Sequence, residues 1–376
     1  MPVVPLFPVG TLAGPDDVVD REAFMADAAA ELTSGQSLVV AGPRRTGKTS
    51  VGKAVLAELD RAGCHTAYVD LFFATGLESL ATQLVQAVVS NRLRMKNRVI
   101  HSWEELLSWL GGFQVTERLA GLEVALTRIG PPRTPEQMLD AALVLSEQMA
   151  ARDQKRLVVL LDEFQEVNRL GGTLLLQRMR AHFQQQRWCT YLFLGSQASL
   201  LNALFAERQR ALYRFALLRD LPPVPDEAWR MYLHRKFEGA GVELTQAGAD
   251  TLLARTGGHP YGLMQVANRA YVLLQHGARR KITADVAVLA CQDVLRTLDR
   301  VYEAEWADVR RVKAAGRILE ALARGESPYQ TNLPAATVYR ALAALVQQGV
   351  IYRPAPRARY RFTEVMFWDW LLGKLT

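Results

Sequence analysis

The sequence predicts an α/β fold, in which a parallel sheet of about five strands is followed by a helical lid and a winged helix-turn-helix. Three observations lead to this prediction. Continuously apolar runs alternate with helical patterns, and a proline cluster follows the last run. From residue 312 a helix, a short second segment, a longer third helix and two strands follow one another. Uninterrupted apolar runs are typical of strands that helices cover on both faces. The runs comprise residues 37–41, 66–73, 157–161, 190–194 and 216–221.

The first apolar run leads into a glycine-rich loop, and residues 50–59 continue with a helical pattern. The loop has the form G-x-x-x-x-G-K-T and matches the phosphate-binding P-loop at every defined position. In such a loop backbone N–H groups converge on a phosphate, Lys48 reaches the β- and γ-phosphates, and the Thr49 hydroxyl ligates Mg²⁺. We therefore expect the chain to bind a nucleoside triphosphate. The predicted contacts are Gly42, Pro43, Arg44, Arg45, Thr46, Gly47, Lys48, Thr49 and Ser50.

A long stretch between the second and third runs predicts a helical insertion over about residues 79–149, because it exceeds what one crossover helix needs. Leu77, Leu80, Leu84 and Val88 recur at helical spacing. The basic cluster that follows either contacts nucleic acid or forms a solvated helix face. This cluster comprises Arg92, Arg94, Lys96 and Arg98.

The third apolar run ends in two acids, Asp162 and Glu163. A carboxylate at the end of a strand beside a P-loop can hold Mg²⁺ through its waters, and an adjacent glutamate can orient and deprotonate an attacking water. Asp162 is therefore the candidate metal ligand and Glu163 the candidate general base. The alternative is a pair of exposed acids that open a loop. The P-loop favours the first interpretation, and hydrolysis over passive binding.

The fourth run ends at Ser196, and three arginines precede the fifth run. A polar side chain at this strand end is expected beside the γ-phosphate, where Ser196 either senses the phosphate or positions the water. The alternative is a simple cap of the next helix. A guanidinium among the arginines could reach a neighbouring subunit's γ-phosphate as an arginine finger, although surface arginines are common. The arginines are Arg208, Arg210 and Arg214, and Arg214 is the candidate catalytic residue.

The proline cluster at residues 222–225 is the expected domain boundary, because prolines end strands and stiffen linkers. Four parts follow from this boundary and from the element order. They are an N-terminal segment (1–33), the α/β core (34–221), a helical lid (222–304) and a winged-helix domain (305–376).

The composition is that of a globular protein, with 49% hydrophobic and 22% charged residues. No apolar stretch approaches the roughly 18 residues of a membrane span, and the proline-broken start of the chain is a poor signal peptide. Three widely spaced cysteines, Cys64, Cys189 and Cys291, form neither a zinc pattern nor a disulfide framework. These features predict a cytoplasmic protein with no membrane partner.

The formal net charge of +7 is concentrated near the C-terminus. From Trp306 onward the sequence has eleven basic residues and only five acidic ones. The expected recognition helix, residues 334–348, offers few base-reading side chains, whereas the wing is rich in arginine. One reading is a module that holds the backbone of double-stranded DNA, with strong salt dependence. The other is a regulatory module packed on the core, with solvated arginines. The candidate contacts are Arg340, Arg353, Arg357, Arg359 and Arg361.

Taken together, these motifs resemble the archaeal-type ATPases of the AAA+/STAND group. The resemblance rests on the P-loop G-P-R-R-T-G-K-T-S, on L-L-D-E-F-Q, on the G-S strand end, on T-G-G-H-P-Y at residues 256–261, and on Y-R-F before F-W-D-W. It implies ATP and Mg²⁺ as cofactors, with His259 and Pro260 near the adenine or the phosphates. It also implies that Arg21 and the segment 1–33 border the nucleotide. The stretch before the fifth run is similar to the family's L-Y-G-R but lacks the glycine.

The sequence favours an ATP-hydrolysing molecular switch with slow turnover, whose lid and winged helix move with nucleotide state. One alternative is a DNA-binding regulator that senses ATP with negligible turnover. Another is a protein-interaction scaffold that never binds nucleic acid. A protein partner or self-association is compatible with each.

Overall fold

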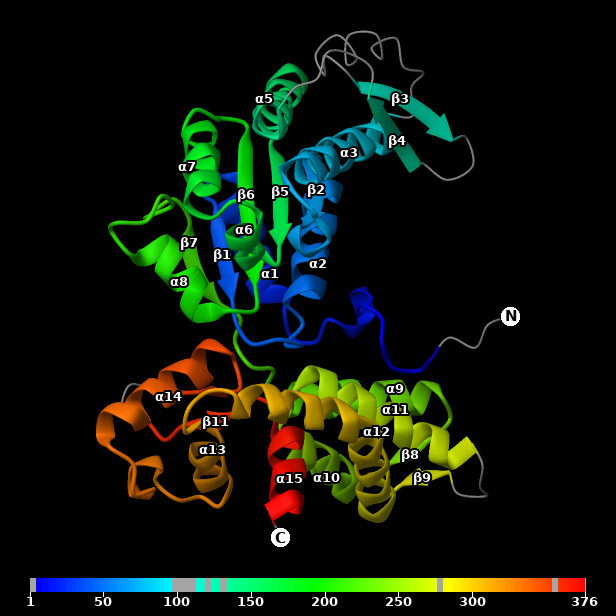
Figure 1. Cartoon of the computed structure of the whole chain (residues 1–376). Coiled ribbons are helices and arrows are strands. Elements are labelled where there is room, and N and C mark those ends of the chain that lie inside the picture. The colour runs from blue at the N-terminus through cyan, green and yellow to red at the C-terminus, as the bar shows by residue number, and fades with distance from the viewer. Residues whose placement is uncertain are drawn as a thin grey trace.

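The structure, a computed structural model, describes residues 5–96, 113–118, 123–128, 134–275, 280–353 and 358–375. It has two layers, an α/β domain and a mainly helical layer, and the N-terminal segment runs between them (Figure 1). The P-loop lies on the side of the α/β domain that faces the helical layer. Residues from both layers therefore meet around this loop.

Five parallel strands form the central sheet, as the sequence predicts. Their order is β2-β5-β6-β1-β7, so the strand that precedes the P-loop lies between β6 and β7. Because all neighbours are parallel, their carboxyl ends meet at one edge, where Ala41 pairs with Gly195 and Asp70 with Asp162. The strands are β1 (Leu38–Ala41), β2 (His65–Asp70), β5 (Leu157–Asp162), β6 (Cys189–Gly195) and β7 (Leu217–Asp220).

Helices cover both faces of the sheet, and strand side chains alternate between the two resulting cores. Val158 and Leu160 of β5 pack in the core beneath α1 and α2, whereas Val159 and Leu161 pack in the opposite core. The first face carries α1 (Glu22–Thr33) and α2 (Lys48–Arg61), and the second carries α3 (Leu77–Lys96), α5 (Pro135–Asp153), α7 (Gly172–Phe183) and α8 (Ala198–Ala206). Short helical turns are η1 (Pro15–Asp17), η2 (Leu71–Phe73), η3 (Phe164–Glu166) and α6 (Val167–Leu170).

The fifth strand is not the buried strand that its apolar residues predict. Leu217 and Leu218 of β7 are 45% and 41% exposed. The strand stands at one end of the strand order, and all four of its residues are exposed. The apolar run therefore indicates a strand correctly, but at an edge position it does not indicate burial.

The expected helical insertion is wrong in its centre. Phe113–Arg118 (β3) and Glu123–Arg128 (β4) form an antiparallel pair, flanked by α3 and α5. The first of these strands begins with an alternation of apolar and polar residues, Phe113-Gln114-Val115-Thr116, a period of two that favours strand over helix. Of the basic cluster, Arg98 lies outside the described residues, and the other three lie in the last turns of α3.

The described residues of the lid form four helices and a small parallel strand pair. Its last helix, α12, runs for 27 residues, so the domain boundary expected at residue 304 falls inside a continuous helix. Among the described residues, no helix, α12 included, is both long enough and apolar enough to cross a membrane. The elements are α9 (Asp226–Gly239), β8 (Glu243–Leu244), α10 (Gln246–Thr256), α11 (Pro260–Gln275), β9 (Lys281–Ile282) and α12 (Ala284–Arg310).

The described residues after α12, which we call the C-terminal unit, pack on the lid through one hydrophobic core. This core is continuous and includes Phe7 of the N-terminal segment, Trp229 of α9 and Leu371 of the last helix, α15. The strands of the unit are antiparallel, with Ile351 opposite Phe362. Its elements are α13 (Ala315–Ala323), η4 (Pro328–Gln330), α14 (Ala335–Gln347), β10 (Ile351–Tyr352), β11 (Arg361–Phe362) and α15 (Val365–Leu375).

Candidate functional site

The P-loop joins the end of β1 to the first residue of α2, Lys48. Gly47 precedes that helix with a φ of 88°, in the left-handed region that glycine adopts without steric cost. The Gly42 N–H donates to the Gly195 carbonyl at 3.3 Å and ties the loop to the end of β6. The first N–H groups of a helix have no partner within the helix, so this loop and helix start suit a phosphate.

Lys48 is a buried cation, only 7% exposed. Its Nζ donates to the Pro43 carbonyl and lies 3.5 Å from Thr46 Oγ1. Burial lowers the pKa of Lys48 to about 8, and the Glu163 and Asp162 carboxylates oppose that shift. A phosphate placed against this ammonium group would supply the full negative charge that the neighbouring carbonyl and hydroxyl lack.

Thr49 and Asp162, the two predicted metal ligands, touch each other. Thr49 Oγ1 donates to Asp162 Oδ2 at 2.7 Å, and Asp162 is 2% exposed. The Tyr68 hydroxyl donates to the same oxygen at 3.2 Å and lies 3.5 Å from Asp70 Oδ2. Burial, together with these carboxylates, raises the pKa of Tyr68, so the phenol stays a neutral donor. Burial also raises the pKa of Asp70.

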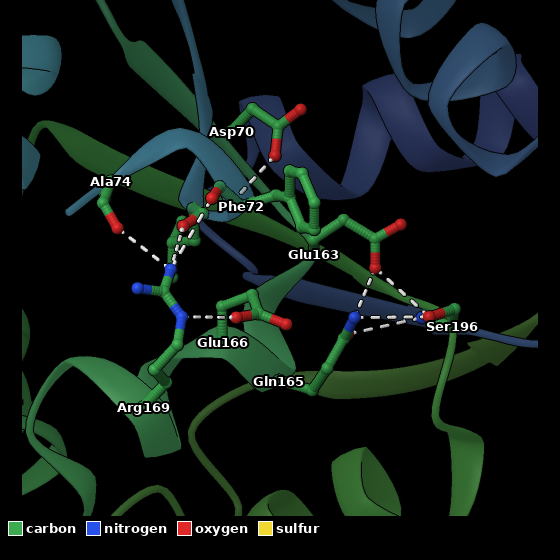
Figure 2. A network of polar contacts seen from close by, with 9 residues as sticks. Asp70, Phe72, Ala74, Glu163, Gln165, Glu166, Arg169 and Ser196 are labelled. Atoms are coloured by element: carbon green, nitrogen blue, oxygen red, sulfur yellow. Dashed lines mark hydrogen bonds and ion pairs between the residues drawn. The ribbon is translucent and has the colours of Figure 1, made fainter. Parts of the chain in front are cut away.

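Glu163 is partly buried and forms hydrogen bonds with the buried residues Gln165 and Ser196, as Figure 2 shows. Gln165 Nε2 donates to Glu163 Oε2 and, at 3.1 Å, to Ser196 Oγ. Ser196 Oγ donates to Glu163 Oε2 at 3.1 Å. Ser196 does not cap α8, since that position is taken by Gln197, which makes no side-chain cap bond. Its hydroxyl donates to the Glu163 carboxylate instead.

A pocket of about 390 Å³ lies between the P-loop, the N-terminal segment and the lid. This volume is in the range of small-molecule sites. Val18, Val19 and Met264 form apolar walls, and Glu163 lies at the P-loop side. The predicted residues that line the pocket are Arg21, Arg44, Arg45, Thr46, Gly47, Lys48, Thr49, Ser50, Glu163 and Pro260. The predicted residues outside its lining are Gly42, Pro43, Asp162, Ser196, Arg214 and His259.

Arg21 lines this pocket although it is only 4% exposed. Its Nη1 is buried and has no hydrogen-bond partner among the described residues. Burial lowers the pKa of the guanidinium, against the attraction of the neighbouring acids Asp20 and Glu22. A buried donor without a partner beside a pocket is suited to a hydrogen-bond acceptor on a ligand.

His259 lies behind the P-loop rather than in the pocket. It is 8% exposed, and both ring nitrogens are buried without a hydrogen-bond partner in the described part of the chain. The Arg44 backbone lies close to the ring but outside hydrogen-bond geometry. Burial lowers the pKa of His259, and the Glu364 carboxylate opposes the shift, so the ring is neutral at physiological pH. The next residue, Pro260, starts α11 and does line the pocket.

The P-loop also contacts both parts of the helical layer through Arg45. Its guanidinium lies 4.2 Å from the centre of the Tyr261 ring in the lid and 4.0 Å from Glu364 Oε2 in the C-terminal unit. Glu364 in turn accepts a hydrogen bond from the Tyr302 hydroxyl. Arg45 has a φ of 63°, a left-handed conformation that costs a non-glycine residue free energy.

The remaining predicted residues lie away from the pocket lining. Arg214 is exposed, has a φ of 55° and lies over the Tyr213 ring. Arg340 is exposed on α14, and Arg353 lies over the Tyr360 ring while its Nε donates to the Ala358 carbonyl at 2.7 Å. Arg359 and Arg361 are exposed, and Arg357 lies outside the described residues.

Residues 32–204, which contain the P-loop, Asp162 and Glu163, match the family model described as an AAA domain. This segment is therefore similar to AAA domains in sequence. The whole chain has the fold of archaeal-type AAA+ P-loop ATPases, which confirms the resemblance inferred from its motifs. No curated protein matches the chain significantly in sequence.

Solved structures resemble the chain over nearly its whole length. The Walker-type ATPase PABY2304 of Pyrococcus abyssi matches with a TM-score of 0.72 and 18% identity, over 98% of this chain and 99% of that one. The ORC2 protein of Aeropyrum pernix, solved as ADPNP–ADP complexes, matches with a TM-score of 0.57 and 14% identity, over 95% and 94%. The ORC1 protein of the same organism, solved in complex with DNA, matches with a TM-score of 0.51 and 15% identity, over 96% of each chain.

Proposed function

We propose that the protein binds ATP with Mg²⁺ and hydrolyses it slowly, as an AAA+ switch of the STAND kind. The observation that carries this proposal is the pocket in which the AAA domain presents the P-loop and Glu163 together. The ADPNP–ADP complexes of the similar ORC2 protein support an adenine nucleotide. Arg21, Pro260 and the apolar walls would then surround the nucleoside, and the P-loop the phosphates.

The residues of the site have distinct roles in this reaction. Lys48 holds the β- and γ-phosphate oxygens, and Glu163 accepts the proton of the water that attacks the γ-phosphorus. The new P–O bond forms as the bond to the ADP oxygen breaks, giving ADP and phosphate. Thr49 Oγ1 and Asp162 Oδ2 fit Mg²⁺, because hard oxygen donors already lie 2.7 Å apart. Mg²⁺, when bound, neutralises charge that develops on the β- and γ-phosphate oxygens.

Metal dependence tests the proposed ATPase directly. We expect steady phosphate release from ATP with Mg²⁺, and a loss of about 10²-fold or more when EDTA removes the metal or when Asp162→Asn weakens its site. Asp60→Asn on α2 is the matched control, because Asp60 does not line the pocket. No phosphate release by the wild type, together with tight ATP binding, would instead support the regulator that only senses ATP.

The contacts of Arg45 support a switch that couples nucleotide to the C-terminal unit. Phosphate oxygens and the Glu364 carboxylate compete for the same guanidinium, so each weakens the hold of the other. We expect Glu364→Gln to raise ATP affinity by about 2- to 10-fold, as judged by titration calorimetry. Glu326→Gln, at an exposed site of the same unit, should leave affinity unchanged. Equal affinity of Glu364→Gln and the wild type would remove Glu364 from the coupling.

The C-terminal unit has the element order of a winged helix, and we propose that it binds double-stranded DNA through its exposed arginines. The DNA complex of the similar ORC1 protein supports this proposal. Each lost phosphate contact lowers the slope of log K against log salt by about 1, so Arg359→Ala with Arg361→Ala should lower it by about 2. Arg311→Ala, at the end of α12, is the control. No binding at low salt would favour the protein-interaction scaffold.

We also propose that Arg214 acts as an arginine finger on the γ-phosphate bound by a neighbouring copy of the chain. Its exposure outside the pocket of its own chain is compatible with service to a neighbouring copy. The measurement is light scattering with and without ATP, combined with turnover at increasing protein concentration. Turnover per site that rises with concentration in the wild type, but not in Arg214→Ala, would support the finger.

A further inference from the structure

We propose that Gln165 is a positioning residue for ATP hydrolysis, which holds the Glu163 carboxylate and the Ser196 backbone and hydroxyl in one rigid group. This inference rests on the proposed function, in which Glu163 is the general base. Gln165 does not line the pocket and would touch neither nucleotide nor water. Gln165 acts on the reaction through Glu163, which lines the pocket.

The neighbours of the Gln165 amide fix which way its oxygen and its nitrogen face (Figure 2). The Ser196 N–H, which can only donate, lies 3.3 Å from Oε1. The amide oxygen must therefore face Ser196, and Nε2 must face Glu163 Oε2 and Ser196 Oγ. Because Gln165 is only 6% exposed, its amide makes its hydrogen bonds with these protein groups.

Packing locks the Gln165 side chain in this position. A Cβ atom added to Gly195 would lie 2.4 Å from Gln165 Oε1 and 2.5 Å from Leu201 Cδ1. The end of β6 thus leaves room for a hydrogen atom and no more. This close approach explains a glycine at position 195, which the phosphate chemistry alone would not require.

Glu163 needs such support because its backbone is in an unfavourable conformation. Its φ and ψ are 49° and 44°, in the left-handed region that few non-glycine residues adopt. Such a conformation persists where surrounding contacts determine it. Gln165 lies two residues after Glu163, in the turn η3, and its amide donates a hydrogen bond back to the Glu163 carboxylate.

The contacts leave one carboxylate oxygen of Glu163 for chemistry. The side-chain hydrogen bonds that Gln165 and Ser196 make to Glu163 both end on Oε2. Oε1 is then the oxygen that accepts the proton of the attacking water. By fixing Oε2, the amide sets the direction in which Oε1 points.

The decisive test is the pH dependence of turnover in Gln165→Glu, a change that keeps the side-chain shape. The introduced carboxyl still accepts from the Ser196 N–H, but it donates to Glu163 only when protonated. When ionised, it repels the Glu163 carboxylate instead. We expect kcat at pH 8 to fall by about 10- to 100-fold with KM within about twofold. The ratio of variant to wild-type kcat should then rise as the pH falls toward 5.5.

Two further variants distinguish positioning from loss of packing. Gln165→Met removes the donor at every pH, so its kcat should be low with a ratio to wild type that does not change with pH. Gln177→Glu makes the same chemical change at an exposed site of α7 and should match the wild type throughout. ATP titration of each full-length variant gives the number of folded sites by which kcat is divided.

The outcomes separate this inference from the proposed function. Two results for Gln165→Glu would overturn the positioning role: a ratio of variant to wild-type kcat that does not change with pH, or a kcat equal to that of the wild type. Provided that turnover still needs Glu163, either result leaves the proposed function intact. If Gln165→Glu does not fold, a Gln165→Met protein with wild-type kcat overturns it. Absence of hydrolysis in the wild type overturns the proposed function and this inference with it.

Discussion

Replacement of Glu163 by glutamine is expected to lower ATP turnover by about 10²- to 10⁴-fold, the usual contribution of a general base. The amide has nearly the shape of the carboxylate, so it can stay beside Gln165 and Ser196, but it cannot accept the proton of water. ATP affinity should stay within about threefold, because the P-loop and Lys48 are untouched. Single-turnover phosphate release and ATP titration on the same protein measure both quantities.

A suitable control for this change lies in the same turn. Glu166→Gln alters a carboxylate that pairs with Arg169 at 2.8 Å and does not line the pocket (Figure 2). It should retain turnover, since a partly exposed ion pair contributes at most about 1 kcal/mol to stability. Equal turnover in Glu163→Gln and wild type would remove Glu163 from the chemistry.

Lys48→Met is expected to have opposite effects on ATP binding and on the stability of the nucleotide-free protein. Loss of the ammonium group should weaken ATP binding by about 10²-fold or more, since a charge-assisted phosphate contact is lost. In the nucleotide-free protein, the pKa of Lys48 is about 8, below its ordinary value of 10.5. The charged form is therefore disfavoured by folding, at a cost of about 3 kcal/mol at pH 7.

This cost has a definite pH dependence. It is fully present below about pH 8 and is relieved as the pH rises from about 8 toward 10.5, where the unfolded lysine also loses its proton. Lys48→Met should remove it, so that the nucleotide-free variant melts at a higher temperature than wild type at pH 7. Thermal melts with and without ATP check both effects, with Lys155→Met at an exposed position as the control. A lower melting temperature without nucleotide would contradict the buried-charge argument.

The sequence predicts the core fold well because its signals are local. A P-loop, a strand ending in Asp162 and Glu163, and a strand ending in Gly195 each occupy a few adjacent residues. The failures concern the insertion, where β3 and β4 form a strand pair, the domain boundary at residue 304, which falls inside α12, and the burial of the fifth strand. Leu217 and Leu218 predict a buried strand, yet β7 is exposed. Burial depends on what covers a strand in the folded chain rather than on its own residues, since β2, at the opposite edge of the sheet, is mostly buried.

The candidate site is predictable to the same extent. The motif residues Lys48, Thr49, Asp162 and Glu163 come together in the structure, as their spacing relative to strands indicates. The contact from Arg45 to Glu364 escapes prediction, because the two residues lie at opposite ends of the chain and no periodicity links them.

The supporting roles of two residues near the motifs were also missed. Tyr68 looks like an ordinary strand residue until its register beside β5 brings its hydroxyl to Asp162. Gln165 follows the acids closely, but the turn η3 that folds its amide back toward Glu163 has no sequence signature. Tertiary geometry determines both contacts.

The single hydrophobic core of the lid and the C-terminal unit has a consequence for how the molecule unfolds. The shared core runs from Phe7 through Trp229 to Leu371, so neither part can melt without exposing the apolar surface of the other. Heating should therefore produce two cooperative transitions in calorimetry, one for the sheet domain and one for the whole helical layer, instead of three. In mechanical terms, the C-terminal helices are a rigid extension of the lid, and the linker at residues 221–225 is the place where a hinge can act.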